Sequence, residues 1–266
     1  MLLRSIVSAA ALAAAALPAH AAISLNSAAS TYAQTFDALA NAGTNNAWAN
    51  DSTLQGWSLF NSAGNAITTI NAGDGSVNTG SFYSFGSSAA TDRALGGTAS
   101  GGAYFGSPAS GAVAGYIALA LTNTSGAAFD SFTLSFDGEQ WRNGGNTSAQ
   151  TMALQYGFGA TFGSVSSWTA AGAAFNWASP VVGATGAAVN GNTAGRVANV
   201  GGTVTTNWAA GDTLWVRWVE NNDTSNDHGL AIDNLSLSVS SVPEGDGLVL
   251  AFGGLALLGG LVRRRR

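Results

Sequence analysis

The sequence predicts an all-β fold, an antiparallel jelly-roll-like β-sandwich, and three observations support this fold class. Segments of alternating apolar and polar residues recur along the chain. No stretch beyond residue 21 shows the 3.6-residue apolar period of a helix, and turn-forming residues separate the alternating segments. Because strands with one apolar and one polar face are typical of antiparallel sheets, we expect two such sheets packed face to face.

Four segments show the alternation clearly, and their apolar positions are Phe132/Leu134/Phe136, Met152/Leu154/Tyr156/Phe158, Leu214/Val216/Trp218 and Leu235/Leu237/Val239. Residues 116–121 are more continuously apolar, so we expect a central strand there. Residues 160–202 have the weakest pattern and are expected to form long loops. Without an internal repeat or a linker, residues 22–241 are expected to form one domain.

Residues 1–21 have the three parts of a secretory signal peptide. Arg4 supplies the positive charge, residues 6–17 form an Ala-rich apolar core, and Pro18 precedes the small-x-small cleavage site at residues 19–21. We therefore expect the export machinery and signal peptidase to act on this chain.

Residues 242–266 also have three parts: Val242, Pro243 and Glu244, then a Gly-rich apolar run over residues 248–262, then four arginines, Arg263, Arg264, Arg265 and Arg266. As a helix the run would measure roughly 22 Å, against roughly 30 Å for a bilayer core. It is predicted to be a short sorting helix that holds the protein at the inner membrane transiently, with its arginines in the cytoplasm. An ordinary tail anchor is the alternative.

This order resembles the PEP-CTERM sorting signal of Gram-negative bacteria, although Gly245 stands where that box has its second proline. The resemblance implies processing by an exosortase-type enzyme. It also implies delivery to the outer cell surface or the extracellular (biofilm) matrix, with its exopolysaccharide.

A second resemblance covers most of residues 22–241. In order, its motifs are TFDAL (Thr35–Leu39), AWANDSTLQGW (Ala47–Trp57), FYSFGSSAATDRALG (Phe82–Gly96), DGEQWRNGG (Asp137–Gly145), VNGN (Val189–Asn192) and LWVRWVENNDTSNDHGLAIDNLSLSV (Leu214–Val239). The series is similar to an uncharacterised domain of exported bacterial proteins. That resemblance implies a jelly-roll-like β-sandwich without an established activity of its own.

The composition argues against disulfides and against nucleic-acid binding. Lysine and cysteine are absent and the net charge is −5, so disulfides are excluded and nucleic acid is not an expected partner. An acidic surface suits solubility outside the cell and affinity for divalent cations.

Acidic and amide side chains cluster between residues 220 and 233. Their oxygens are the ligands that Ca²⁺ prefers, so we hypothesise a structural calcium held by Glu220, Asp223, Asp227 and Asp233 in a loop between two strands. The alternative is that these residues cap turns and bond to nearby amides.

A second cluster follows the strand that ends at Phe136. Trp141 could stack on a sugar ring while Glu139, Gln140 and Arg142 bond its hydroxyls. The alternative is a structural fork in which Arg142 or Arg217 meets Glu139 or Asp92. Two or three of the eight tryptophans, if exposed on one face, would indicate a carbohydrate platform.

Enzyme templates find little support. The chain lacks a Cys nucleophile, a Lys base and a phosphate-binding loop, and outside residues 1–21 a Ser-His-Asp triad could use only His228. A glycosidase pair of Glu139 and Glu220 is conceivable. The leading interpretation is a non-catalytic structural or adhesive protein of the cell surface. An exopolysaccharide-binding module is the alternative, and a hydrolase is the third hypothesis.

Overall fold

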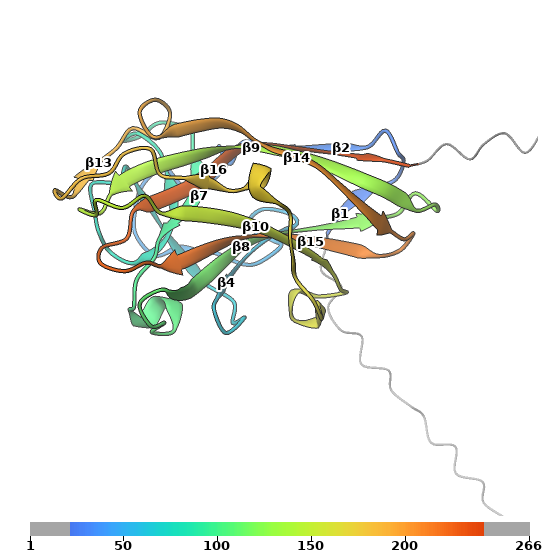
Figure 1. Cartoon of the computed structure of the whole chain (residues 1–266), viewed down its shortest axis with the longest axis horizontal. Coiled ribbons are helices and arrows are strands. Elements are labelled where there is room, and N and C mark those ends of the chain that lie inside the picture. The colour runs from blue at the N-terminus through green and yellow to red at the C-terminus, as the bar shows by residue number, and fades with distance from the viewer. Residues whose placement is uncertain (1–21, 242–266) are drawn as a thin grey trace, which may run out of the picture.

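Residues 22–241 are described by a computed structural model, and they form two β-sheets packed face to face (Figure 1). One sheet has seven strands in the order β1-β8-β15-β10-β11, with β4 and β12 pairing β8 and β10. The other has nine strands in the order β13-β9-β16-β7-β6-β5-β3, with β14 and β2 pairing β9 and β16. The described residues contain no α-helix, so the predicted all-β sandwich is confirmed.

The strands vary widely in length. In the seven-stranded sheet they are β1 (Ile23–Leu25), β4 (Trp57–Asn61), β8 (Ala112–Asn123), β10 (Thr151–Phe158), β11 (Thr169–Ala170), β12 (Trp177–Ala178) and β15 (Thr213–Asn222). In the nine-stranded sheet they are β2 (Thr31–Gln34), β3 (Asn46–Ala47), β5 (Thr69–Gly73), β6 (Ser81–Phe85), β7 (Ala94–Thr98), β9 (Phe129–Asn143), β13 (Ala187–Ala188), β14 (Arg196–Trp208) and β16 (Gly229–Ser240). Three 3₁₀ turns complete the fold: η1 (Ala103–Phe105), η2 (Phe162–Ser164) and η3 (Ala173–Phe175).

The core lies between the sheets and is built from the alternating residues. Phe132, Leu134 and Phe136 of β9 are buried against the inward-facing residues of β15, and the Phe136 ring meets Trp218 edge-on at 5.4 Å between centroids. Residues 116–121 lie in β8, which pairs β1, β4 and β15, so the predicted central strand is confirmed. Consecutive long strands from β8 to β16 alternate between the two sheets.

Two details of the sheets differ from the prediction. The pairings β1–β8 and β5–β6 are parallel, so the sheets are not purely antiparallel. Strand β14 lies partly in the region expected to form loops. Among the strands, it pairs only β9, bulges at residues 197–200 and is largely exposed, so it carries too few apolar residues for a clear alternation.

The outer face of the seven-stranded sheet carries a second aromatic cluster. Trp215 is buried there beside Phe162 of η2, and the guanidinium of Arg217 lies between the rings of Tyr116 and Trp168, at 4.1 and 3.9 Å from their centroids. Trp168 is half-buried and the other seven tryptophans are buried. The structure therefore gives no face with several exposed tryptophans in the described region.

The predicted signal peptide (1–21) and sorting tail (242–266) lie outside the described residues. Within residues 22–241, no helix is long and apolar enough to cross a membrane.

Candidate functional site

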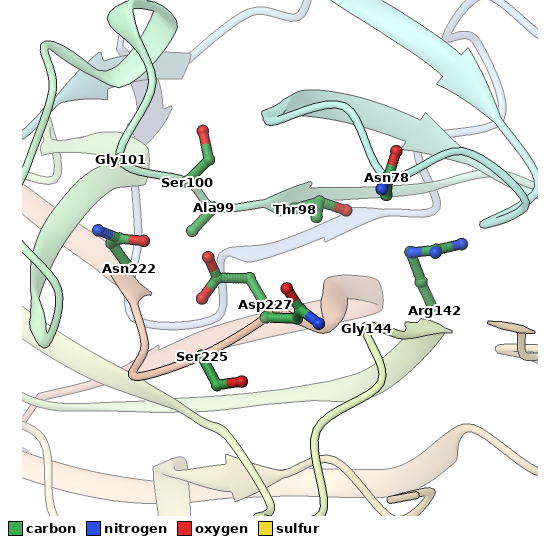
Figure 2. Close-up of a pocket in the computed structure, with 11 residues that line it drawn as sticks. Asn78, Thr98, Ala99, Ser100, Gly101, Arg142, Gly144, Asn222, Ser225 and Asp227 are labelled. Carbon is green, nitrogen blue, oxygen red and sulfur yellow. The ribbon is translucent and has the colours of Figure 1, made fainter. Parts of the chain in front are cut away.

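A polar cleft of about 240 Å³ opens at the end of the sandwich where β9 and β15 finish (Figure 2). Its walls come from four separate parts of the chain: the β5–β6 connection, the end of β7, the end of β9, and the end of β15 with the loop that follows it. The lining residues are Asn78, Thr98, Ala99, Ser100, Gly101, Arg142, Gly144, Asn222, Ser225, Asn226 and Asp227. Hydroxyl, amide and charged groups therefore dominate the cleft.

The β15–β16 loop (223–228) is fixed by its own hydrogen bonds and by the β9–β10 loop. The Asp223 N–H donates to Asp227 Oδ1 at 2.7 Å, which closes the loop on itself. The Asn146 amide donates to the carbonyls of Thr224 and Asn226, and the Gln150 amide also donates to that of Asn226. The wall of the cleft is thus held in shape before any ligand arrives.

His228 anchors the same loop from within. Its side chain is buried, its Nδ1 accepts from the Gly144 N–H at 2.9 Å, and its Nε2 lies 3.2 Å from the Ser148 carbonyl, to which it donates in this tautomer. Burial lowers the pKa of His228 and keeps the ring neutral. Because both ring nitrogens are engaged with backbone groups, the geometry does not support a triad base at His228.

Replacing His228 with Ala is expected to lower the free energy of unfolding by about 2 kcal/mol, because it removes two hydrogen bonds and leaves a cavity. Urea denaturation followed by tryptophan fluorescence measures this change. Thr147→Ala, an exposed change on the β9–β10 loop that His228 contacts, is the control and should alter stability by less than about 0.5 kcal/mol. Equal stabilities of the two variants would contradict the anchoring role.

Asp227, which lines the cleft, and Glu220, which is buried near it, both have raised pKa values. Burial, together with the nearby Asp223 carboxyl, raises the pKa of Asp227 to about 7. Burial first, and then Asp227 and Asp223, raise the pKa of Glu220 well above its ordinary value. Glu220 projects from β15 toward β7, next to Gly97, and its Oε1 is buried without a hydrogen-bond partner. The cleft therefore carries less negative charge at weakly acidic pH than its acidic residues suggest.

The predicted calcium ligands do not converge. Glu220 is in β15 and Asp233 is in β16, so neither lies in the loop where both were expected, and only Asp223 and Asp227 do. Among the described residues, no group of three or more His, Asp or Glu side chains is placed to hold a metal ion. Because the strands extend further than the sequence indicated, the four residues do not share one loop, and a structural calcium held by them stays a prediction.

The predicted sugar contacts are mostly buried. Residues 137–142 continue strand β9 rather than following it. Trp141 is 2% exposed, stacks on Phe85 and donates from Nε1 to Glu139 Oε2 at 2.9 Å, while Gln140 bonds both backbone groups of Val181. Of the four, only Arg142 reaches the cleft, and Trp141 contributes to the lining of a separate hollow.

The predicted Arg–carboxylate fork also takes another form. Arg196 and Asp137 make the ion pair, 2.7 Å between Nη2 and Oδ2, and Asp137 also accepts from the Asn199 N–H and the Asn234 amide. Arg217 bonds Gln155 instead. The hydrogen bonds to Asp137 join β14 and β16 to β9 at the two bulges that flank this residue.

Most cleft residues could not be found from the sequence. Asn78, Thr98 and Ser100 are single polar residues in unrelated segments, and no spacing links them. The one usable signal is the density of acidic and amide residues between positions 220 and 233, which includes Asn222 and Asp227 but indicates a metal loop.

No family model and no curated protein matches the chain. Solved structures with some similarity include the CBM22-1 xylan-binding domain of Xyn10C from Paenibacillus barcinonensis, at 8% identity and TM-score 0.38, over 81% of this chain and 97% of that one. Another is a carbohydrate-binding module CBM36 in complex with calcium and xylotriose, at 16% identity and TM-score 0.22, over 49% and 77% of the two chains. A third is an arabinose-bound α-L-arabinofuranosidase, MgGH51, at 11% identity and TM-score 0.31, over 82% and 29%.

Proposed function

We propose that this is an exported cell-surface protein that binds a glycan of the surrounding matrix in the cleft at the end of the sandwich. The observation that carries the proposal is the cleft itself, a preorganised hollow lined by hydroxyl, amide and guanidinium groups. Sugars present hydroxyls around the ring, and such a lining offers both hydrogen-bond donors and acceptors. The predicted signal peptide and sorting tail support a location where such glycans occur.

The size of the cleft favours part of a chain over a whole small molecule. Its volume of about 240 Å³ lies below the range of roughly 300–1,000 Å³ that is typical of small-molecule sites. A second hollow of about 530 Å³ lies beside the same loop, is lined by residues 145–150, 184 and 223–225, and shares Ser225 with the cleft. A polysaccharide that contacts both hollows would gain contacts from each.

We propose binding without turnover. Asp227 lines the cleft with its carboxyl group, whereas Glu220 is buried beside Gly97. Both ring nitrogens of His228 are hydrogen-bonded to backbone groups. A glycosidase needs two carboxyl groups that face one substrate bond, and Glu139 and Glu220, the conceivable pair, are both buried and neither lines the cleft.

Glycan-array screening followed by calorimetric titration of the purified protein tests the proposal. Asn226→Trp, which places a large side chain at the cleft, is expected to weaken glycan binding at least about tenfold, because it occupies the space of the ligand. Thr124→Trp is the matched control, since Thr124 is exposed on the β8–β9 connection at the opposite end of the sandwich. Binding that survives Asn226→Trp would place the site elsewhere, and no binding to any glycan would favour the structural matrix role.

A further inference from the structure

One of the four arginines of the described region differs from the other three in the hydrogen bonds of its guanidinium group. Three of them direct the edge formed by Nε and Nη2 at an oxygen acceptor: Arg93 at Ser84, Arg196 at Asp137 and Arg217 at Gln155. Arg142 uses only Nη1, which donates to the carbonyls of Gly75 and Ser76 at 2.9 and 3.1 Å. Its Nε is buried without a hydrogen-bond partner.

Arg142 is also held firmly in place. It is 9% exposed, it lies in β9 between β13 and β16, and its exposed part lines the cleft (Figure 2). Within residues 22–241 no carboxylate lies within 4 Å of its guanidinium. A nearly buried guanidinium with no counter-charge is costly for the free protein, and a ligand that supplied one would lower that cost.

We infer that Arg142 binds the carboxylate of a uronic acid residue in the glycan. This inference rests on the proposed function and names the class of glycan. A carboxylate at the exposed part of the guanidinium would supply the missing charge, whereas a neutral hydroxyl would supply none.

One neighbouring feature suits the same ligand. The raised pKa values of Asp227 and Glu220 reduce the repulsion that an anionic sugar would meet at weakly acidic pH.

Calorimetry at pH 6 with defined trisaccharides tests the inference. The probes are the galacturonate, glucuronate, mannuronate and guluronate trimers, their methyl esters, and neutral trimers of the corresponding hexoses. We expect at least one uronate to bind the native protein about tenfold or more tighter than its own ester, because the ester loses the charge-assisted bonds. This contrast needs no variant, so it stands even where a substitution impairs folding.

Arg142→Gln removes both the charge and the planar guanidinium, and it is expected to abolish the preference for acid over ester. Arg217→Gln is the matched control on the outer face of the seven-stranded sheet and should keep that preference. If neutral trimers bind as tightly as uronates, or Arg142→Gln keeps the preference, the inference fails while the proposed function stands. If none of these trimers binds, the inference fails, and the glycan array decides whether the proposed function stands. Inorganic phosphate or sulfate that competes at the same concentration as the uronate would also overturn the uronate assignment, in favour of a general anion site.

Discussion

The Gly96→Ala protein is expected to lose at least about 4 kcal/mol of stability and to be recovered largely unfolded, because the new methyl group meets backbone atoms. Gly96 lies in β7, which is hydrogen-bonded to β6 on one side and β16 on the other. A Cβ at this position would lie 2.1 Å from the Leu230 carbonyl oxygen and 2.5 Å from the Ala231 Cα. Neither strand can move away without breaking pairs in the middle of the sheet.

Gly163→Ala is the matched control. Gly163 lies in η2, and a Cβ there would have no heavy atom within 4 Å. Circular dichroism and thermal unfolding of the two variants should therefore give a nearly native protein for Gly163→Ala and little cooperative transition for Gly96→Ala. A Gly96→Ala protein that melts within a few degrees of the native protein would contradict the packing of β7 against β16.

The melting temperature is expected to fall by at least about 5 °C between pH 5 and pH 8.5, because several acidic groups are buried with raised pKa values. Burial raises the pKa of Glu139 to about 7 and that of Asp233 to about 8, and Asp227 and Glu220 are shifted in the same direction. The folded protein therefore holds more protons than the unfolded chain in this range.

The melting temperature is expected to fall with rising pH because of this difference in bound protons between the folded and unfolded states. A group with a raised pKa contributes its full stability below its unfolded value, near 4, and loses the contribution as the pH rises through its folded value, here about 7 to 8. The lowered pKa of His228 has the opposite effect, but only as the pH falls below about 6.5. Stability should thus decline across the neutral range.

Asp233→Asn and Glu139→Gln copy the shape of the neutral acids and should each flatten the pH profile. The exposed Asp212→Asn is the control and should leave its slope unchanged. Thermal unfolding at half-unit pH steps measures the slopes. A native profile that is flat or rises between pH 5 and pH 8.5 would show that these carboxyl groups are hydrated or paired in solution.

The sequence was a good guide to the strands and a poor guide to the cleft. Alternation with a period of two is a local property, so the residues of β9, β10, β15 and β16 that point into the core could be assigned from their own segments. The same reasoning ended strand β9 too early at Phe136. The polar run from Asp137 to Arg142 resembles a loop in the sequence. In the structure its side chains form hydrogen bonds with one another and with backbone N–H groups of neighbouring segments.

Composition and alternation alone establish an all-β, lysine-free and cysteine-free protein whose apolar residues suit a two-sheet core. Which polar residues meet depends on how the two sheets pack and how their strands pair. Trp141, which looked like a sugar platform, is buried, whereas Arg142, the next residue in the strand, reaches the cleft. Four segments of the two sheets meet at the same end of the sandwich. Asn78, Thr98, Arg142 and Asp227 therefore lie together. Contacts between residues far apart in the sequence produce no periodic pattern within a single segment. They depend on how the strands pair and not on the neighbouring residues in the sequence.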